Sequence, residues 1–285
     1  MKKSLIWTIS VLITLGAAVF QRFTGPTYPE TYKLKVGNND IKVHLPTSHG
    51  GNSDREIKIW DPAGQLEGSI IYRRFPTEEP WDTTVMRHEG EHLKGSLPSQ
   101  PPAGKLEYSV IIENGQEQIK INDQPVIIRF KGDVPAYVLI PHILFIFAAM
   151  MFSMVTGFFA AFRYPSYRAF GWITLILLVT GGLILGPVIQ KFAFGEFWTG
   201  IPFGKDLTDN KILIAFVIWL IAVIANLKKQ RPWLAVVASA VYLAINLIPH
   251  SLFGSELDYE SGEVVTGGIL FGLIMINSQK TGLLD

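Results

Sequence analysis

The run His-Glu-Gly-Glu-His at residues 88–92 is the part of the sequence closest to a catalytic motif. It satisfies H-E-x-x-H, a pattern in which two histidines on one helix face bind zinc while the glutamate activates a zinc-bound water. The chemistry requires a helix, because residues four apart converge on one ion only there. Here Gly90 is central, and both flanks alternate as strands do. We therefore predict a β-hairpin with Gly90 at its tip, and not a zinc protease.

A second group of polar residues lies in and beside the loop 194–211, which separates two apolar stretches. Polar groups at membrane depth are costly unless they face other helices or water. Tyr242 and Asn246 are four residues apart on a neighbouring apolar stretch, so they share one helix face. Our candidate ligand-binding residues at this rim are Glu196, Trp198, Asp206, Asp209, Asn210, Lys211, Tyr242 and Asn246.

Two other interpretations compete for the same loop. The residues 206–210 stand directly before an apolar run, where Asp or Asn caps the free amides of a helix. Alternatively, carboxylates could bind a hard cation such as Ca²⁺. Those carboxylates are Asp206, Asp209, Glu256 and Asp258, and their spacing matches no known calcium loop. Capping accounts for the end of the loop but leaves Glu196 and Trp198 unexplained.

Two histidines add a cofactor hypothesis. His142 in "LIPHILF" and His250 in "LIPHSLFG" lie at similar expected depths. Neutral imidazoles so placed can be the axial ligands of haem b. The competing interpretation is that each imidazole bonds to a backbone carbonyl at the membrane interface.

The segment "FAFGEFWTGIPFGKDLTDNKILIAFVIWLI" (192–221) bears on the haem hypothesis. It resembles the tryptophan-rich segment of the haem-handling cytochrome c assembly proteins, in which an outer loop rich in Trp, Gly and Asp precedes a Trp-containing helix. The resemblance implies haem handling. The WDP-type core of that family is absent, so its functional residues are not carried over.

Apolar stretches long enough to span a bilayer must position these residues. Only 17% of the chain is charged and its mean hydropathy is +0.28, against about 25% charged residues in soluble domains. A spanning helix needs about 20 apolar residues. Candidate spans are 5–20, 136–162, 169–190, 211–227 and 232–249, with a shorter Gly-rich stretch at 264–277 that could be a further span or a re-entrant helix. We expect the first to be an uncleaved anchor rather than a signal peptide.

Basic residues orient these spans. "MKK", "RYPSYR" (163–168) and "KKQR" (228–231) fall on one side if every stretch spans, and the positive-inside rule makes that side cytoplasmic. Residues 25–133, the loop 194–211 and the segment 249–263 then share the opposite side.

Residues 25–133 alternate with period two and have turn signals every 8–12 residues, which predicts an antiparallel β-sandwich. The stretch "MRHEGEHLKGSLPSQPPAGKLEYSVIIENG" resembles the fibronectin-III and immunoglobulin-like domains of bacterial envelope proteins, with a hairpin, a proline-rich corner and a strand that bears a buried Tyr. The resemblance implies a fold and no activity. The predicted domains are an anchor (1–24), an extracytoplasmic β-sandwich (25–133) and a transmembrane bundle of four or five helices (134–285).

Several function classes are excluded or disfavoured. The chain has no cysteine, which removes disulfides, thiolate catalysis and iron–sulfur clusters. The G-x-S-x-G, Walker A and G-x-G-x-x-G patterns are absent. The net charge of +1 does not favour nucleic acid as a partner. These absences favour a non-enzymatic role, and an enzyme is kept as the third alternative.

The sequence therefore predicts a polytopic protein of the bacterial inner membrane, in contact with lipid. Its periplasmic β-sandwich binds or positions an envelope protein, and its outer rim docks a partner or a small ligand. The alternative is a redox or haem-handling membrane subunit that binds haem b or a quinone.

Overall fold

The computed structural model divides the chain into two compact units. It describes residues 2–36, 39–115, 117–249 and 254–266. Among the described residues, the helical unit comprises 2–26, 134–249, 254–255 and 266, and the β unit comprises 27–36, 39–115, 117–133 and 256–265. The sequence predicted one helical domain over 134–285. The structure differs in grouping Glu256–Val265 with the strands.

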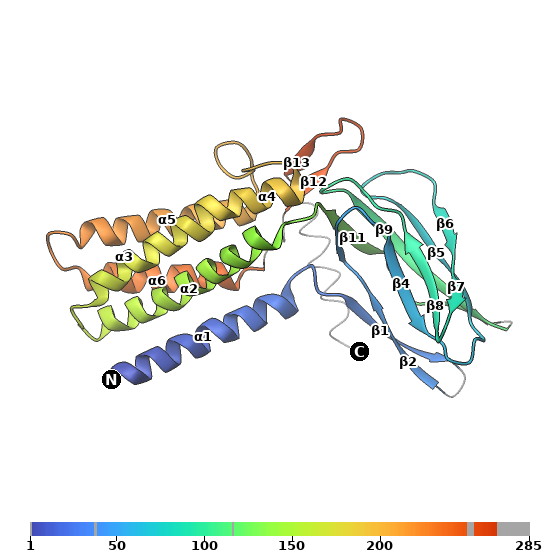
Figure 1. Cartoon of the computed structure of the whole chain (residues 1–285), viewed down its shortest axis with the longest axis horizontal. Helices are drawn as coiled ribbons and strands as arrows, with labels where there is room; N and C mark the ends of the chain where they lie inside the picture. The colour runs from blue at the N-terminus through green and yellow to red at the C-terminus, as the bar shows by residue number, and fades with distance from the viewer. Residues whose placement is uncertain (1, 37–38, 116, 250–253, 267–285) are drawn as a thin grey trace. The chain divides into compact units, whose positions relative to one another are not determined.

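Apolar helices that run back and forth form the helical unit (Figure 1). They are α1 (Lys3–Thr24), α2 (Ala136–Ala161), α3 (Tyr167–Leu178), the π-helical turn η1 (Val179–Leu185), α4 (Gly186–Phe194), α5 (Leu207–Ala225) and α6 (Pro232–Leu247). Four segments are long and apolar enough to cross a membrane among the described residues: Lys3–Thr24, Ala136–Ala161, Tyr167–Phe194 and Leu207–Ala225. Helix α6 is apolar but shorter, with 16 residues. The chain is thus built as a membrane protein, with α1 packed against α2 and α6.

The last apolar stretch predicted by the sequence, 264–277, begins differently. Val264–Thr266 is strand β13 and not the start of a helix. Residues from 267 onward lie outside the described part of the chain.

The π-helical turn interrupts the third span where two glycines allow neighbouring helices to come close. A Cβ on Gly181 would lie 2.8 Å from the Phe145 side chain of α2, and one on Gly182 would lie 2.8 Å from Ile212 of α5. Pro187 follows directly and has no N–H to donate to an α-helical bond. The N–H of Gly186 instead donates to the Gly181 carbonyl, five residues back. Two causes account for the wide turn. The glycines allow α2 and α5 to pack closely against it, and Pro187 lacks the N–H that an α-helical hydrogen bond would need.

Three sheets make up the main part of the β unit. Their strands are β1 (Glu30–Val36), β2 (Asn39–Leu45), β3 (Ser48–Gly50), β4 (Arg55–Trp60), β5 (Glu67–Arg74), β6 (Asp82–Val85), β7 (Arg87–Glu89), β8 (His92–Leu97), β9 (Lys105–Asn114), β10 (Glu117–Lys120) and β11 (Val126–Lys131). The sheet orders are β1-β2, β3-β11-β9-β5-β6 with β10 on β9, and β4-β8-β7. Pairing is antiparallel except between β3 and β11, which are parallel.

Inward-facing residues of these sheets share one apolar core. Residues from β1, β2, β4, β5, β8, β9 and β11 belong to a single buried cluster. Tyr108 belongs to this cluster and is fully buried, and its hydroxyl donates to the Pro46 carbonyl at 2.9 Å. The predicted buried Tyr is therefore present. A buried phenol needs such a partner.

The hairpin at the H-E-x-x-H pattern is confirmed. Gly90 has a φ of +62° between β7 and β8, a conformation that glycine adopts without strain. His88 donates through Nε2 to the Leu66 carbonyl at 2.7 Å. The pattern is therefore a tight turn between paired strands, with His88 held by the backbone of a neighbouring segment.

A second, short hairpin closes the β unit. It consists of β12 (Ser255–Leu257) and β13 (Val264–Thr266). Glu256 forms an ion pair of 2.5 Å with Lys105, whose side chain is only 3% exposed. The hydroxyl of Tyr259 accepts a 2.9 Å hydrogen bond from the Lys105 backbone N–H. Burial is the main cause that lowers the pKa of Lys105 to about 8, and the charge of Glu256 opposes the shift.

Candidate functional site

The rim predicted from the loop 194–211 is a network that fastens this loop to the helical unit. Asp206 is the N-cap of α5, and its Oδ1 accepts hydrogen bonds from the backbone N–H groups of Thr208 (2.8 Å) and Asp209 (3.2 Å). The capping interpretation is therefore confirmed. The residue is buried and is bound by its own helix.

Asp209 also accepts a hydrogen bond from the backbone of its own unit. Its side chain is buried, with the residue 6% exposed, and Oδ2 accepts from the Thr199 backbone N–H at 2.7 Å. Gln190 of α4 donates to the Thr199 hydroxyl at 2.6 Å, and Ser255 lies 3.3 Å from that hydroxyl. Asp209 therefore binds Thr199, and Thr199 is in turn held by side chains from two other segments.

The remaining loop residues hold turns or face outward. Asn210 accepts from the Ile201 N–H at 2.8 Å through Oδ1, and the Trp198 indole donates to the Ile201 carbonyl at 3.1 Å. Lys211 is buried and donates to the Ile248 carbonyl at 2.7 Å. Glu196 is exposed. The loop brings Trp198 and Asn210 together at one backbone segment, whereas Glu196 stands apart from this network.

The polar stripe on α6 is also turned toward neighbouring helices. Tyr242 and Asn246 are both buried. The Asn246 amide donates to the Tyr242 carbonyl one turn earlier at 2.8 Å. Gln21 of α1 donates to the Asn246 carbonyl. These contacts join α1 to the end of α6. They explain why the side-chain amides of Gln21 and Asn246 are tolerated between apolar helices.

His142 is bonded to the π-helical turn. Its Nδ1 donates to the Gly181 carbonyl at 2.9 Å, which is the backbone-bonding interpretation of this residue. Because a carbonyl can only accept, Nδ1 carries the proton, and the neutral ring keeps its lone pair on Nε2. His250, its predicted partner, lies outside the described residues.

The hard-cation interpretation does not fit the geometry. Glu256 is engaged with Lys105, and Asp206 and Asp209 hold backbone amides. Among the residues that the structure describes, no three His, Asp or Glu side chains gather where they could bind a metal ion.

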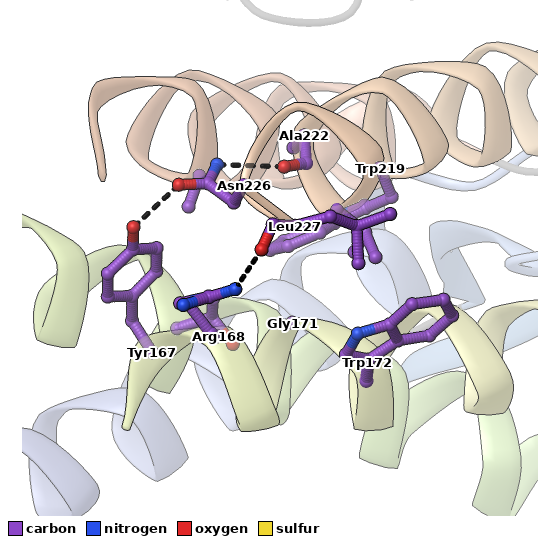
Figure 2. A pocket seen from close by; sticks show the side chains of 11 residues that line it. Tyr167, Arg168, Gly171, Trp172, Trp219, Ala222, Asn226 and Leu227 are labelled. Atoms are coloured by element: carbon purple, nitrogen blue, oxygen red, sulfur yellow. Dashed lines mark hydrogen bonds between the residues drawn. The ribbon is translucent and has the colours of Figure 1, made fainter. Parts of the chain in front are cut away.

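A small cavity lies between α3 and α5 (Figure 2). Its volume is about 30 Å³, which suits one or two waters and is far below the roughly 300 Å³ of the smallest usual ligand pockets. Tyr167 donates to Asn226 at 2.6 Å, and Asn226 donates to the Ala222 carbonyl at 2.8 Å. This polar cluster joins two helix ends and offers no ligand site.

The β unit carries a much larger concavity. An open groove of about 480 Å³ lies on β2, β4 and the start of β8. Its lining residues are Lys42, His44, Pro46, Arg55, Glu56, Ile57, Lys58, Trp60 and His92. We call the outward face of β1, β2, β4, β8 and β7 around this groove the basic face; its cations are Lys33, Lys35, Lys42, Arg55, Lys58, Arg87 and Lys94. The volume is that of a site for a ligand or a partner's side chains.

Like charges stand directly opposite one another on the basic face. Lys33 pairs with Lys42 between β1 and β2. Lys94 pairs with Lys58 on one side and with Arg87 on the other. Directly opposed like charges destabilise a sheet by a few tenths of a kcal/mol or more per pair. Folding alone does not account for the pair of Lys33 and Lys42.

Acidic residues neutralise only part of this face. Glu56 lies 2.5 Å from Lys58 and 3.8 Å from Lys94, and Glu89 lies 2.8 Å from Lys94. The hydrogen bond and charge of Lys94 lower the pKa of Glu89. Lys33, Lys42, Arg55 and Arg87 form no ion pair with the described residues.

The basic face contrasts with the composition of its own unit. Residues 27–133 contain 13 Lys and Arg against 16 Asp and Glu, so the segment has a net charge of −3. Seven of the 13 cations lie on the basic face, although the segment as a whole is acidic. A local field of this sign attracts anionic groups.

Sequence reasoning overlooked this face, and the signal was present in the strand pattern. The runs "TYKLKV", "DIKVHL" and "REIKIW" each place lysine at alternating, outward positions. In the structure Lys33, Lys42 and Lys58 are all exposed. The sequence does not predict that β2 lies beside β4, because no ladder of hydrogen bonds joins these two strands.

Comparisons with known proteins supply no family. No protein-family model matches this chain, and no curated protein matches it significantly.

Proposed function

We propose that the chain is an inner-membrane protein of a bacterium whose β unit, on the periplasmic side, binds an envelope partner through the basic face. The observation that carries the proposal is the set of opposed like charges beside the groove of about 480 Å³. A surface that is electrostatically unfavourable in the folded protein gains most from a partner of opposite charge. The helical unit anchors this surface at the membrane.

The rest of the architecture supports this role. The common core of the sheets and the buried Tyr108 support an immunoglobulin-like sandwich, a fold whose functions are those of its surfaces. The positions of Lys and Arg in the short loops support an orientation with the β unit outside the cytoplasm. Glu196 and Trp198 remain the rim residues best placed for a secondary docking role, since Glu196 is exposed and Trp198 partly so.

Photo-crosslinking in living cells tests the proposal. A benzoylphenylalanine at Trp60, which is 49% exposed and lines the groove, should crosslink to a distinct envelope protein. The same residue at Val85, which is 69% exposed on β6 and lies outside the groove lining, is the matched control. The Trp60 crosslink should disappear with Lys42→Glu/Lys58→Glu. A crosslink that is absent, or unchanged by this charge reversal, would contradict the proposal.

A second candidate is a haem b or quinone subunit, since the contact of His142 with the backbone uses only one of its two ring nitrogens. The Nδ1 bond of His142 to the Gly181 carbonyl fixes the tautomer and leaves Nε2 as the acceptor, which is the arrangement that orients many ligating histidines. An absorption spectrum of the purified, dithionite-reduced protein decides this point. A sharp α-band that vanishes in both His142→Ala and His250→Ala supports haem, and a colourless protein contradicts it.

A further inference from the structure

The groove on the basic face lies where β2 and β4 are neighbours but are not joined by a ladder of hydrogen bonds. Among the described residues β2 pairs only with β1, and β4 pairs only with β8. In the described part of the chain, the other edge of β2 and the other edge of β4 have no hydrogen-bonded ladder, and β2 and β4 are themselves neighbours in space. An unpaired strand edge presents N–H and C=O groups that can accept a further strand from another chain.

Lysines along such edges select the strand that can pair there. Edge lysines repel other β-proteins and so prevent unspecific pairing. Lys33 and Lys42 repel each other across β1 and β2, and neither forms an ion pair with the described residues. An acidic strand is the one kind of strand that relieves this repulsion instead of increasing it.

The spacing of the cations also suits an extended chain. Outward residues along one strand, such as Lys42 and His44 on β2 or Lys58 and Trp60 on β4, are about 6.6 Å apart, twice the rise per residue. A peptide that runs along these strands repeats its own side chains at the same distance. Every second residue can therefore place a carboxylate next to the basic face.

Arg55 and Trp60 supply the groups that would anchor such a peptide. Arg55 lines the groove, and its Nε has no hydrogen-bond partner among the described residues. Its guanidinium can bind a carboxylate through two parallel hydrogen bonds. Trp60 is half exposed at the far end of β4, opposite His92, and exposed Trp and Arg dominate the binding energy of many interfaces.

We infer that the partner contributes an extended segment with acidic residues at alternate positions, which binds along β2 and β4 in the groove. This inference rests on the proposed function, because it specifies the chemistry of the same surface. It concerns a protein strand and not an anionic polysaccharide or a lipid surface.

The test uses the full chain in detergent and a fluorescent peptide of about eight residues in which Glu alternates with Thr. This peptide should bind, and its counterpart with Gln for Glu should bind roughly tenfold more weakly or less. Lys42→Glu and Lys58→Glu should each lower the affinity roughly tenfold. Lys120→Glu, an exposed lysine on β10 outside the groove lining, should leave it within about twofold. Thermal melting confirms that all three variants fold.

Two further probes separate this inference from the proposed function. Oligogalacturonate and phosphatidylglycerol vesicles are titrated against the same variants. Suppose that either probe binds, that Lys58→Glu abolishes this binding, and that the Glu-Thr peptide does not bind. This result overturns the inference but preserves the proposal that the basic face binds a partner. Failure of all three probes, together with no Trp60 crosslink in cells, overturns both. Equal binding of the Glu and Gln peptides overturns the inference.

Discussion

The rim of the helical unit and the basic face of the β unit are both rich in polar residues, but they use them in opposite ways. At the rim, Asp206 and Asp209 are buried and accept hydrogen bonds from the chain's own amides. On the basic face, Lys33 and Lys42 are exposed, opposed and without an ion-pair partner among the described residues. Polar residues of the first kind hold a fold together, whereas those of the second kind are available to another molecule.

The comparison predicts where substitutions cost stability and where they cost binding. The ion pair between Lys105 and Glu256 belongs to the first kind, although it lies in the β unit. Glu256→Gln should destabilise the β unit by roughly 3 kcal/mol, because it leaves a buried ammonium without its counter-charge. Thermal melting followed by the circular dichroism of the strands measures this. The exposed Glu260→Gln on the same hairpin is the control, and equal melting of the two variants would refute the role given to the pair.

Asp209→Ala should destabilise the helical unit by about 2 kcal/mol, because the Thr199 N–H then loses its acceptor in a buried site. Unfolding in mixed detergent micelles measures the loss. Glu196→Ala in the same loop should change stability by less than about 0.5 kcal/mol, since its side chain is exposed. If Glu196→Ala proves as costly as Asp209→Ala, the hydrogen bond between Asp209 and Thr199 is not what holds this loop in place.

Raising the pH from about 8 toward 9.5 should stabilise the β unit by roughly 1–2 kcal/mol. Burial lowers the pKa of Lys105 and of Lys131 to about 8, from a usual value of 10.5. Between these values the unfolded chain binds more protons than the folded one, so stability increases with pH. Below about 8 both states are protonated and the full cost of burying the charge remains. Above about 10 the trend reverses, because burial raises the pKa of Tyr259 to about 12.

Melting temperatures across this range test the pH prediction. Lys105→Met should show a smaller increase than the wild type, because only the Lys131 contribution is left. An undiminished increase in Lys105→Met would contradict the assignment to Lys105.

The smallest effect is expected on the basic face. Lys33→Gln or Lys42→Gln should raise stability slightly, by about 0.3 kcal/mol, because each removes one member of a like-charge pair. The same substitutions should weaken binding of the Glu-Thr peptide. Thermal melting of each variant checks the predicted gain in stability, and peptide titration of the same preparation checks the predicted loss of binding. Lys120→Gln is the control. A loss of stability would mean that these lysines serve the fold.

Local features could be predicted from the sequence because they depend on neighbouring residues. The Asp206 cap and the Gly90 hairpin are of this kind, since each is set by a few side chains next to one another. The apolar helices follow from length and hydropathy alone. The predicted alternation also places Lys42 and Lys58 on outward positions.

Features that depend on tertiary contacts were missed for a physical reason. The sequence offers no sign that Glu256 is the counter-charge of Lys105, 151 residues earlier. The groove depends in the same way on a tertiary contact. In space β2 lies beside β4, although β3 comes between them in the sequence. Asp209 and Lys211 were predicted as ligand-binding residues from their place at the rim, and the sequence did not show that Asp209 would bind the Thr199 N–H or Lys211 the Ile248 carbonyl.

The central claim is that the basic face recognises negative charge on a partner, and a charge-swap titration tests it most directly. The Lys42→Glu/Lys58→Glu variant of the full chain is titrated with the Glu-Thr peptide and with a matching Lys-Thr peptide. The preference should invert: the wild type binds the acidic peptide and the variant binds the basic one. An unchanged preference, or equal binding of both peptides by both proteins, would contradict the account.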